Sequence, residues 1–376
     1  MHLALQEAEQ ARGRTSPRPS VGAVLIRDGV VVGRGYTQPR SGPHAEVVAL
    51  QEAGERARGA TLYCTLEPCA HYGNTPPCTD ALIRAGVMRV VAAQQDPNPL
   101  VAGQGFAHLR AHGIAVEVGD GAEEAWGQLA PFFTYITKGR PWVTAKWAMS
   151  LDGKIATRTR NAHWISDVTS RGLVHEMRDV VDAIMVGIGT AIADDPQLTV
   201  RLAATGHRRS QRLRPPWRVI IDAQGRIPLN LKVTRDELAT ATVVVTTPAM
   251  ATEKEVALIN RGIRVLRVVA TDMGHVDLSA ALRELIKLDI CHVLVEGGSG
   301  LLGGLLDYRL IDEVRVFVAP LLLGGEKAQP VTAGLGVAMV ADGARVCWTA
   351  VRPLERDVLL EGYVEYQSEG SHGDLS

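Results

Sequence analysis

The chain has 376 residues, of which 46% are hydrophobic and 22% are charged, and its formal net charge is −1. The length predicts two domains, and the composition is typical of globular proteins. The near-neutral charge argues against a binder of nucleic acid or of anionic membranes, and no apolar run reaches the ~18 residues of a membrane span. The five cysteines are too sparse for a disulfide framework, and their odd number favours a reducing cytoplasm.

The first part of the chain predicts a helix followed by a β-hairpin. Residues 1–7 carry an acid and lack the basic and apolar stretches of a secretion signal. Residues 21–26 and 30–35 have the alternating pattern of β-strands, and Asp28-Gly29 between them is a strong signal for a hairpin turn. The elements expected next are a helix, a strand, a helix and a strand, at residues 44–56, 61–66, 79–85 and 87–93. This order predicts an α/β layer sandwich.

A second α/β series follows a break at about residues 131–141, where Lys138-Gly139-Arg140-Pro141 resembles a linker. The strands expected in this series are residues 142–149, 183–186, 218–221, 242–246 and 292–295. The clearest helices expected are residues 168–181 and 278–288. The pattern implies helices that cover a largely parallel sheet. We therefore predict one domain at residues 1–120, a connecting segment at 121–140 and a second domain at 141–366.

Four residues of the first domain have the pattern of a catalytic zinc site. His44, Cys69 and Cys78 offer one imidazole nitrogen and two thiolates, which can hold one zinc ion and leave its fourth tetrahedral position to water. Zinc lowers the pKa of such a water to about 7. Glu46 is too close to His44 to be a ligand but can move the protons of that water. This arrangement is typical of zinc nucleobase deaminases, although their usual C-x-x-C spacing is much shorter than the spacing here.

The other cysteines are not expected to bind the metal: Cys64 is expected to be a packed core thiol, and Cys291 and Cys347 to be structural. Cys64 falls within a predicted strand, and Cys291 and Cys347 fall in the second domain. His71 lies between the two cysteine ligands. Its imidazole either contacts a substrate or caps its own loop, and the sequence leaves both possibilities open.

The wide cysteine spacing and the segments around it resemble one family, the bifunctional pyrimidine deaminase/reductases of riboflavin biosynthesis. The segments that carry the resemblance in the first domain are Pro43-His44-Ala45-Glu46, Thr65-Leu66-Glu67-Pro68-Cys69, Thr75-Pro76-Pro77-Cys78 and Asp96-Pro97-Asn98-Pro99. In the second domain they are residues 146–154, 164–166 and 189–201. Cytidine deaminases and tRNA adenosine deaminases share the zinc core but lack the Thr-Pro-Pro-Cys loop.

The resemblance implies a fold and two reactions. It implies a cytidine-deaminase-like three-layer sandwich followed by a dihydrofolate-reductase-like α/β domain. The first domain would deaminate 2,5-diamino-6-ribosylamino-4(3H)-pyrimidinone 5′-phosphate with zinc. The second would reduce 5-amino-6-ribosylaminouracil 5′-phosphate with NADPH. It further implies a homo-oligomer, a dimer or larger, joined through the reductase domain.

The resemblance also implies site residues. In the deaminase, Asp96 and Asn98 would help to hold the ribose phosphate. The NADPH site would be lined by Ala148, Trp164, Thr190, Asp194, Ala223, Gly298, Ser299, Gly300, Leu301, Leu302, Gly303 and Gly304. The reductase substrate would face Arg178, Leu198, Arg201, Glu296 and Ala162, the last standing where the family usually has serine. Paired hydrogen bonds from a guanidinium suit a phosphate, and a glycine-rich strand-to-helix turn lets backbone N–H groups approach one.

Two departures from the family pattern make the grip on the deaminase substrate uncertain. Arg18 stands where the family has an asparagine that touches the pyrimidine, and Asn74 stands where it has a cation. One hypothesis is that Arg18 replaces the missing phosphate charge; the alternative is that Arg18 points to solvent and the deaminase is weakened.

Other polar residues also allow two interpretations. Asp152 either orders the Asp-Gly turn or lies beside the nicotinamide, and we favour the turn. The basic stretch at residues 207–214 is expected to be a solvated loop rather than an RNA-binding segment, because no aromatic residues are interleaved with its charges. Two rival functions stay open beside the two-step enzyme: a nucleic-acid base editor with an appended domain, and an enzyme with one non-catalytic scaffold domain.

Overall fold

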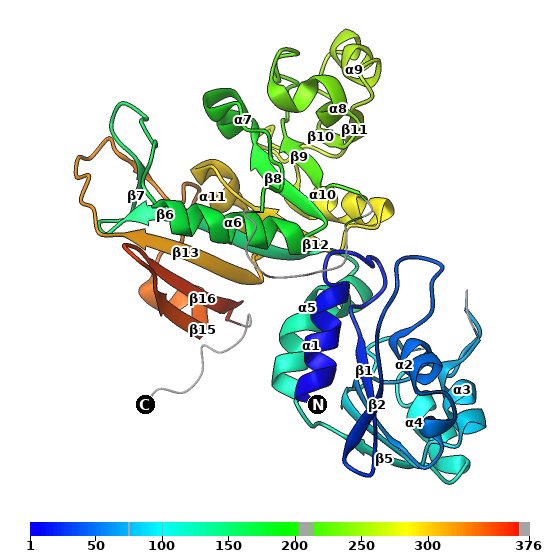
Figure 1. Ribbon diagram of the computed structural model, residues 1–376. Coiled ribbons are helices and arrows are strands. Elements are labelled where there is room, and N and C mark those ends of the chain that lie inside the picture. The colour runs from blue at the N-terminus through cyan, green and yellow to red at the C-terminus, as the bar shows by residue number, and fades with distance from the viewer. Residues whose placement is uncertain (74–75, 100, 203–211, 213, 368–376) are drawn as a thin grey trace, which may run out of the picture. The chain divides into compact units, whose positions relative to one another are not determined.

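The computed structural model describes residues 1–73, 76–99, 101–202, 212 and 214–367. It consists of two compact units, one dominated by residues 1–140 and one by the residues that follow (Figure 1). Within the described residues, no helix is both long and apolar enough to cross a bilayer. Asn74 and most of the basic stretch at 207–214 lie outside the described residues.

The first unit is a five-stranded sheet between two layers of helices. The sheet has the order β2-β1-β3-β4-β5, and β3, β4 and β5 are parallel. Its strands are β1 (Gly22–Arg27), β2 (Val30–Tyr36), β3 (Thr61–Leu66), β4 (Arg89–Gln94) and β5 (Ala115–Val118). One layer holds α1 (His2–Ala11) and α5 (Ala122–Lys138), and the other holds α2 (Ala45–Ala53), α3 (Cys78–Ala85) and α4 (Gln104–Ala111), with the short 3-10 helix η1 (Gly54–Ala57) after α2 (Figure 1).

Local chemistry explains how this unit places its helices. Asp28 and Gly29 have φ values of 50° and 76°, as the predicted hairpin turn requires. A Cβ on Gly35 of β2 would lie 2.3 Å from the carbonyl oxygen of Ala45. Because glycine stands there, α2 packs directly against β2, and the residue before α2, His44, is fixed at the end of the sheet.

The segment predicted to connect the domains is mostly helical. Residues 122–138 form α5, with Pro131 inside the helix. Its apolar side contributes Ala125 and Leu129 to the core of the first unit, and Phe132 packs against that core. The break expected at residues 131–141 therefore begins too early, because the amphipathic face of α5 outweighs the local breaking effect of one proline. The linker-like residues 138–141 do lie where α5 ends and the boundary between the two units falls.

The second unit is built on a nine-stranded sheet with the order β11-β10-β9-β8-β12-β6-β13-β16-β15. The strands from β11 to β13 are parallel, and β16 and β15 add antiparallel at one edge. The strands are β6 (Trp142–Ser150), β8 (Ala183–Gly187), β9 (Trp217–Ile221), β10 (Thr242–Thr246), β11 (Arg264–Arg267), β12 (His292–Val295), β13 (Glu313–Ala319), β15 (Arg345–Pro353) and β16 (Val358–Glu365), and β7 (Lys154–Ala156) pairs separately with β14 (Gln329–Pro330). The largely parallel sheet is as predicted.

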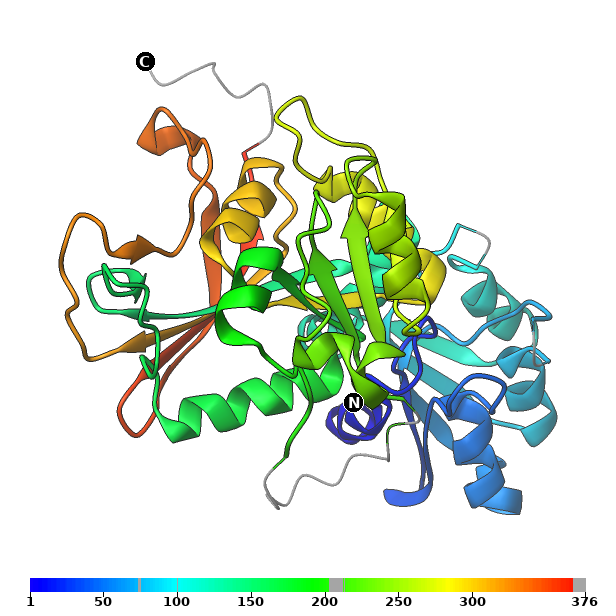
Figure 2. The same ribbon diagram turned by 90° about the horizontal axis from the view of Figure 1, so that it is seen from above.

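Helices cover both faces of this sheet. They are α6 (Val168–Val180), α7 (Ile188–Asp194), α8 (Asp236–Ala239), α9 (Thr252–Ile259), α10 (Leu278–Leu285) and α11 (Ser299–Asp307), with 3-10 helices η2 (Lys232–Thr234), η3 (Ile286–Leu288) and η4 (Val340–Asp342). The chain passes from β6 through α6 to β8 in one direction along the sheet, and from β12 through α11 to β13 in the other direction. Because crossovers between parallel strands are right-handed, α6 and α11 lie on opposite faces of the sheet (Figure 2). The strand ends that precede α7 and α11 therefore meet at one edge of the sheet.

Candidate active sites

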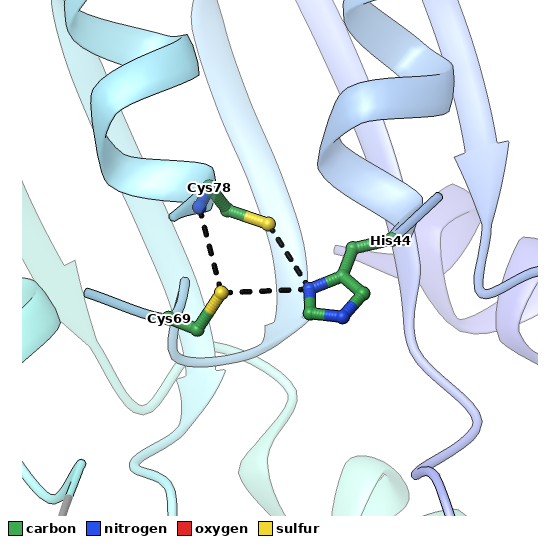
Figure 3. Close-up of side chains that lie close together, drawn as sticks. All are labelled: His44, Cys69 and Cys78. Atoms are coloured by element: carbon green, nitrogen blue, oxygen red, sulfur yellow. Dashed lines mark hydrogen bonds between the residues drawn. The ribbon is translucent and has the colours of Figure 1, made fainter. Parts of the chain in front are cut away.

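The three predicted zinc ligands converge in the first unit. His44 directly precedes α2, Cys78 is the first residue of α3, and Cys69 follows β3. The Nδ1 atom of His44 lies 3.2 Å from the sulfur of Cys78 and 3.5 Å from that of Cys69 (Figure 3). All three ligand atoms lie within 4.8 Å of one another.

This donor set fits zinc. Tetrahedral bonds of ~2.3 Å to sulfur and ~2.0 Å to nitrogen place neighbouring ligand atoms roughly 3.5 Å apart. The separations in the cluster agree with that spacing, and one imidazole with two thiolates leaves a fourth position. His44, Cys69 and Cys78 would therefore hold the ion.

The two thiols differ in how readily they lose a proton. Their mutual hydrogen bond lowers the pKa of Cys69 to about 4 and raises that of Cys78 well above its usual range. The backbone N–H of Cys78, at the start of α3, also donates to the sulfur of Cys69 at 3.4 Å. Cys69 is thus a thiolate at neutral pH, which is the form that binds a metal.

Glu46 stands in the first turn of α2, where only 4% of its surface is exposed. Burial raises the pKa of its carboxyl group, and that group lies within hydrogen-bonding reach of Cys78. A carboxyl group with a raised pKa can accept and release a proton near neutral pH. Glu46 therefore has both the position and the chemistry expected of a proton carrier beside the cluster.

Arg18 is half-buried and contacts the segment that leads into His44. Its Nη1 atom donates to three backbone carbonyls, those of Gln38 (3.2 Å), Pro39 (3.3 Å) and Gly42 (2.9 Å). Burial lowers the pKa of its guanidinium, an effect that the negative groups of Cys78 and Glu46 oppose. Arg18 does not point to solvent, so the orientation given by that alternative is wrong, while a weakened deaminase and the phosphate role of Arg18 both stay predictions.

Asp96 and Asn98 lie in the loop that follows β4. The Asp96 carboxylate accepts the backbone N–H of Asn98 at 2.8 Å, and the Asn98 carbonyl accepts two N–H groups, those of Val101 and Ala102, at 2.8 Å each. Burial raises the pKa of Asp96, which also feels the charges of His71 and Cys69. The loop thus lies on the same side as the zinc ligands. His71 itself is exposed, and its role stays open.

In the second unit, two predicted substrate residues bind each other. The guanidinium of Arg178 on α6 donates to both carboxylate oxygens of Glu296, at 2.6 and 2.7 Å, and to the carbonyl of Thr199 at 2.9 Å. Only 12% and 10% of the two side chains are exposed. Burial opposes ionisation of Glu296, but the charge of Arg178 prevails and lowers its pKa. The pair is a rigid, fully ionised group at the end of β12.

Several predicted cofactor residues meet at the carboxyl edge of the parallel sheet. Gly298 precedes α11, and a Cβ placed on it would lie 3.0 Å from the hydroxyl of Thr190 on α7. A Cβ on Gly300 would meet no atom within 4 Å. No side chain of the N-cap residue, Gly298, accepts a hydrogen bond from the first N–H groups of α11. A pyrophosphate fits such a helix start, and Gly298, Ser299 and Gly300 would hold it.

Other members of the predicted run have packing contacts. A Cβ on Gly303 would lie 1.4 Å from the carbonyl oxygen of Ala333, and one on Gly304 would lie 3.1 Å from Leu278. Leu301 and Leu302 are 8% and 1% exposed. These contacts show why small or apolar residues are needed there, while their contact with a cofactor stays a prediction.

The remaining predicted residues are spread over several elements. Ala148 is on β6, Ala223 follows β9, and Asp194 ends α7. Leu198 is buried in the core, Arg201 contacts His175 and Gln197, and Ala162 lies two residues before Trp164. The Trp164 ring is 69% exposed, and the guanidinium of Arg171 lies 4.6 Å from its centre. These positions thus lie on separate strands, helices and loops of the described chain.

Asp152 orders its turn, as favoured. Its carboxylate accepts the hydroxyl of Ser150 at 2.6 Å and the backbone N–H groups of Leu323 and Gly324 at 3.1 and 2.7 Å. These bonds lower its pKa to about 2. Of the other cysteines, Cys64 is buried, as expected for a packed core thiol, and Cys291 is buried too, while Cys347 is exposed on the edge strand β15.

Two residues of the motifs have a place in these sites that sequence reasoning missed. Lys146 on β6 lies near Glu296, and burial lowers the pKa of its ammonium group. Glu67 has a buried carboxylate that accepts several backbone N–H groups. The sequence could have indicated both residues, because Lys146 is a charged residue within an apolar strand and Glu67 is a charged residue directly after one.

Comparison with known proteins decides the family. The RibD C-terminal domain matches residues 141–360, and the cytidine and deoxycytidylate deaminase zinc-binding region matches residues 1–94. The riboflavin biosynthesis protein RibD of Aquifex aeolicus is 42% identical over 361 residues, 96% of each chain. The chain belongs to the RibD family. It is a bifunctional enzyme of riboflavin biosynthesis, with a zinc-binding deaminase domain and an NADPH-dependent reductase domain.

Other RibD relatives agree along the whole chain. RibD of Escherichia coli is 38% identical, with 96% of this chain and 97% of that protein covered. The solved structure of RibD from Acinetobacter baumannii, form 1, has a TM-score of 0.84 at 36% identity, with 97% of both chains covered. A Thermotoga maritima structure described as a diaminohydroxyphosphoribosylaminopyrimidine deaminase/5-amino-6-(5-phosphoribosylamino)uracil reductase has a TM-score of 0.80 at 34% identity, again with 97% of both chains covered. The predicted mixed α/β fold class is confirmed.

Proposed function

We propose that the N-terminal domain deaminates 2,5-diamino-6-ribosylamino-4(3H)-pyrimidinone 5′-phosphate and that the C-terminal domain reduces 5-amino-6-ribosylaminouracil 5′-phosphate to the ribitylamino product. The observation that carries the deaminase half is the convergence of His44, Cys69 and Cys78 beside the buried Glu46. Because α5 packs on the core of the first unit, we place the boundary between the two domains near residue 140, so that the deaminase domain includes residues 121–140, and the second domain at residues 141–366.

Deamination adds water to the ring carbon and releases ammonia. A bound zinc ion supplies Lewis acidity that brings the pKa of water to about 7. Glu46 would accept one proton from the attacking water and deliver it to the ring nitrogen, and would then carry the second proton of that water to the departing amine, which leaves as ammonia. Asp96 and Asn98 position the ribose phosphate, so that the pyrimidine is presented to Glu46 in one orientation.

Reduction of the ribosyl group to ribityl adds a hydride, which bound NADPH would supply, to the ribosyl carbon, and the ring oxygen released from that carbon takes up a proton. The N–H groups at the start of α11, beside Gly298 and Gly300, bind the cofactor's pyrophosphate. Arg178 and Glu296 present one fixed donor and acceptor surface to the substrate, and Arg201 offers a second guanidinium for its phosphate. Because Arg178 and Glu296 already fix each other's side chains, substrate binding does not have to bear the entropy cost of ordering them.

The test separates the two activities. Ammonia release from the diaminopyrimidine and NADPH oxidation with the ribosylaminouracil phosphate are measured on the full chain, together with bound zinc. We expect about one zinc ion per chain and both activities. Reduction without deamination would identify the first domain as a scaffold, and binding of single-stranded nucleic acid at low salt would favour the base-editor alternative.

We also propose that the protein is a cytoplasmic homo-oligomer joined through its reductase domain. All five cysteines are free, which suits a reducing compartment. The edge strand β15 exposes Trp348 (55%) and Val351 (60%), and the segment before it exposes Leu335 (96%) and Val340 (98%). Apolar side chains exposed in such number support an interface. Light scattering on Trp348→Glu should show a smaller assembly than the parent chain, and an unchanged mass would exclude this surface.

A further inference from the structure

Glu67 is a buried carboxylate that the proposed chemistry does not use. It follows β3 directly, and only 3% of its surface is exposed. One carboxylate oxygen accepts the backbone N–H groups of Asp96 (3.2 Å) and Gly103 (3.0 Å). The other accepts those of Gly105 (2.9 Å) and Phe106 (3.3 Å). Four backbone donors thus surround a single side chain.

The first turn of α4 explains why a charge is tolerated there. Gly105 and Phe106 belong to that turn, where N–H groups have no partner within the helix and the helix dipole favours a negative charge. No side chain at the N-cap position, Gly103, satisfies them. A Cβ on Gly105 would lie 2.0 Å from the Pro68 carbonyl oxygen, so glycine lets α4 approach the carboxylate closely.

The same short segment is fixed to the zinc ligands at its other end. Cys69 is two residues beyond Glu67, and its carbonyl accepts the backbone N–H of Thr79 at 3.2 Å. Its sulfur accepts the N–H of Cys78 at 3.4 Å. Residues 67–69 therefore connect one zinc ligand, held by α3, to the loop of Asp96, held by the Glu67 carboxylate.

We propose that Glu67 is a positioning residue of the deaminase, which sets the place of Asp96 and Asn98 relative to the zinc ligand Cys69. Glu67 touches neither substrate nor metal. It acts through the Asp96 backbone, and so it governs how tightly the ribose phosphate is held rather than whether zinc is bound. This inference rests on the proposed deaminase function.

The test replaces Glu67 by glutamine in the full chain. The Glu67→Gln amide keeps one acceptor oxygen, but its NH2 group would face two backbone N–H donors in either orientation. We expect the deaminase KM to rise about tenfold or more, kcat to change little, and zinc content and reductase activity to stay as in the parent. Amide hydrogen exchange at Asp96, Gly103, Gly105 and Phe106 should accelerate.

The matched control is Glu52→Gln on α2. The Glu52 carboxylate accepts one backbone N–H, that of Arg34, at 2.6 Å on the exposed surface. Its replacement should leave KM unchanged. A second variant, Gly105→Ala, forces α4 away from Pro68 while the carboxylate stays intact, and it should reproduce the rise in KM.

The outcomes separate this inference from the proposed function. An unchanged KM in Glu67→Gln, or a loss of zinc or of the fold, overturns the positioning role. If the parent chain releases no ammonia from the diaminopyrimidine, the proposed function fails instead. Amide exchange still tests the anchoring of the loop in that case, and exchange that Glu67→Gln does not accelerate overturns it.

Discussion

The deaminase cluster and the reductase edge are assembled in different ways. In the first unit, three side chains from separate elements approach within 4.8 Å of one another, and each is fixed by a helix start or a strand end. In the second unit, the predicted residues are spread over strand ends, two helices and loops, and Arg178 and Glu296 are satisfied by each other. The deaminase site is a set of side chains that can bind a single ion, whereas the reductase site is largely a surface of backbone groups.

The difference shows what each ligand requires. A zinc ion needs specific donor atoms at short range, so its site is concentrated in a few residues. A dinucleotide and a sugar phosphate are long and are bound by many weak contacts, several of them from backbone groups. Single substitutions should therefore abolish the first activity and only weaken the second.

The largest effect is expected for Cys78→Ser. Loss of a residue that only hydrogen-bonds to a metal ligand lowers metal affinity or activity by about 10- to 100-fold, so loss of the ligand itself should lower them further. Zinc and ammonia release should disappear while NADPH oxidation persists. Cys347→Ser, at an exposed thiol, is the control and should change neither. Parallel loss of both activities in Cys78→Ser would mean that zinc supports the whole fold.

Glu46→Gln separates metal binding from proton transfer. The variant should retain zinc, while kcat for deamination falls by about 10²- to 10⁴-fold, because the amide cannot carry the proton. Metal analysis and ammonia release measure the two effects. Glu52→Gln, on the same helix, is the control. A variant that deaminates at the parental rate would remove Glu46 from the mechanism.

Glu296→Gln tests the reductase side. Breaking one partner of a buried ion pair costs about 3–5 kcal/mol, so the reductase domain should unfold at lower urea concentration and NADPH oxidation should fall. Deamination should persist. Glu284→Gln removes the exposed partner of Lys287, where the cost should stay below about 1 kcal/mol. Equal stability of the two variants would contradict a structural role for the Arg178 pair.

Arg18→Ala tests the departure from the family pattern. Loss of its charge and of its bonds to the carbonyls of Gln38 and Gly42 should raise the deaminase KM by about tenfold or more, since a hydrogen bond involving a charged group contributes about 1.5–3 kcal/mol. Arg27→Ala, an exposed arginine of β1, is the control. An unaltered KM would end the idea that Arg18 compensates for a missing cation.

The smallest effect is a pH dependence in the second unit. The folded state lowers the pKa of Asp152 from 3.8 to about 2, so ionised Asp152 stabilises the fold above pH ~4 and this stabilisation is lost as the pH falls through about 2. Thermal unfolding of Asp152→Asn should thus differ from that of the parent at pH 5 and converge with it as the pH approaches 2. A constant difference across that range would contradict the assignment.

The sequence predicted the parts that depend on local chemistry. The Asp28-Gly29 turn and the strand at Thr61–Leu66 follow from short-range patterns, and the zinc ligands follow from residue type and order. The helix α5 was not predicted, because Pro131 and Gly139 are typical of the ends of helices. Packing of the apolar face of α5 on the core stabilises the helix in spite of Pro131. The edge strand β15 and its neighbour β16 were not predicted: β16 pairs with β13, which is distant in the chain, and β15 pairs with β16.

Within the sites, the sequence could not separate glycines that face open space from glycines that face protein. Gly300 and Gly303 are three residues apart in one motif, but only Gly303 lies against another backbone segment, at Ala333. Nor could it show that Arg178 binds Glu296 or that Glu67 reaches the N–H of Asp96. Each of these contacts joins segments whose proximity exists only in the folded chain.

The position of α5 bears on how this enzyme can be divided for study. A truncated gene product that ends at residue 120 would lack Leu129, which is 1% exposed, together with Ala125 and Ala130. Loss of such a leucine alone forfeits about 1.5–3 kcal/mol of burial and uncovers an apolar face on the remaining sheet. A deaminase fragment made for crystallisation or kinetics should therefore extend through Lys138, or it will aggregate before its metal site can be assayed.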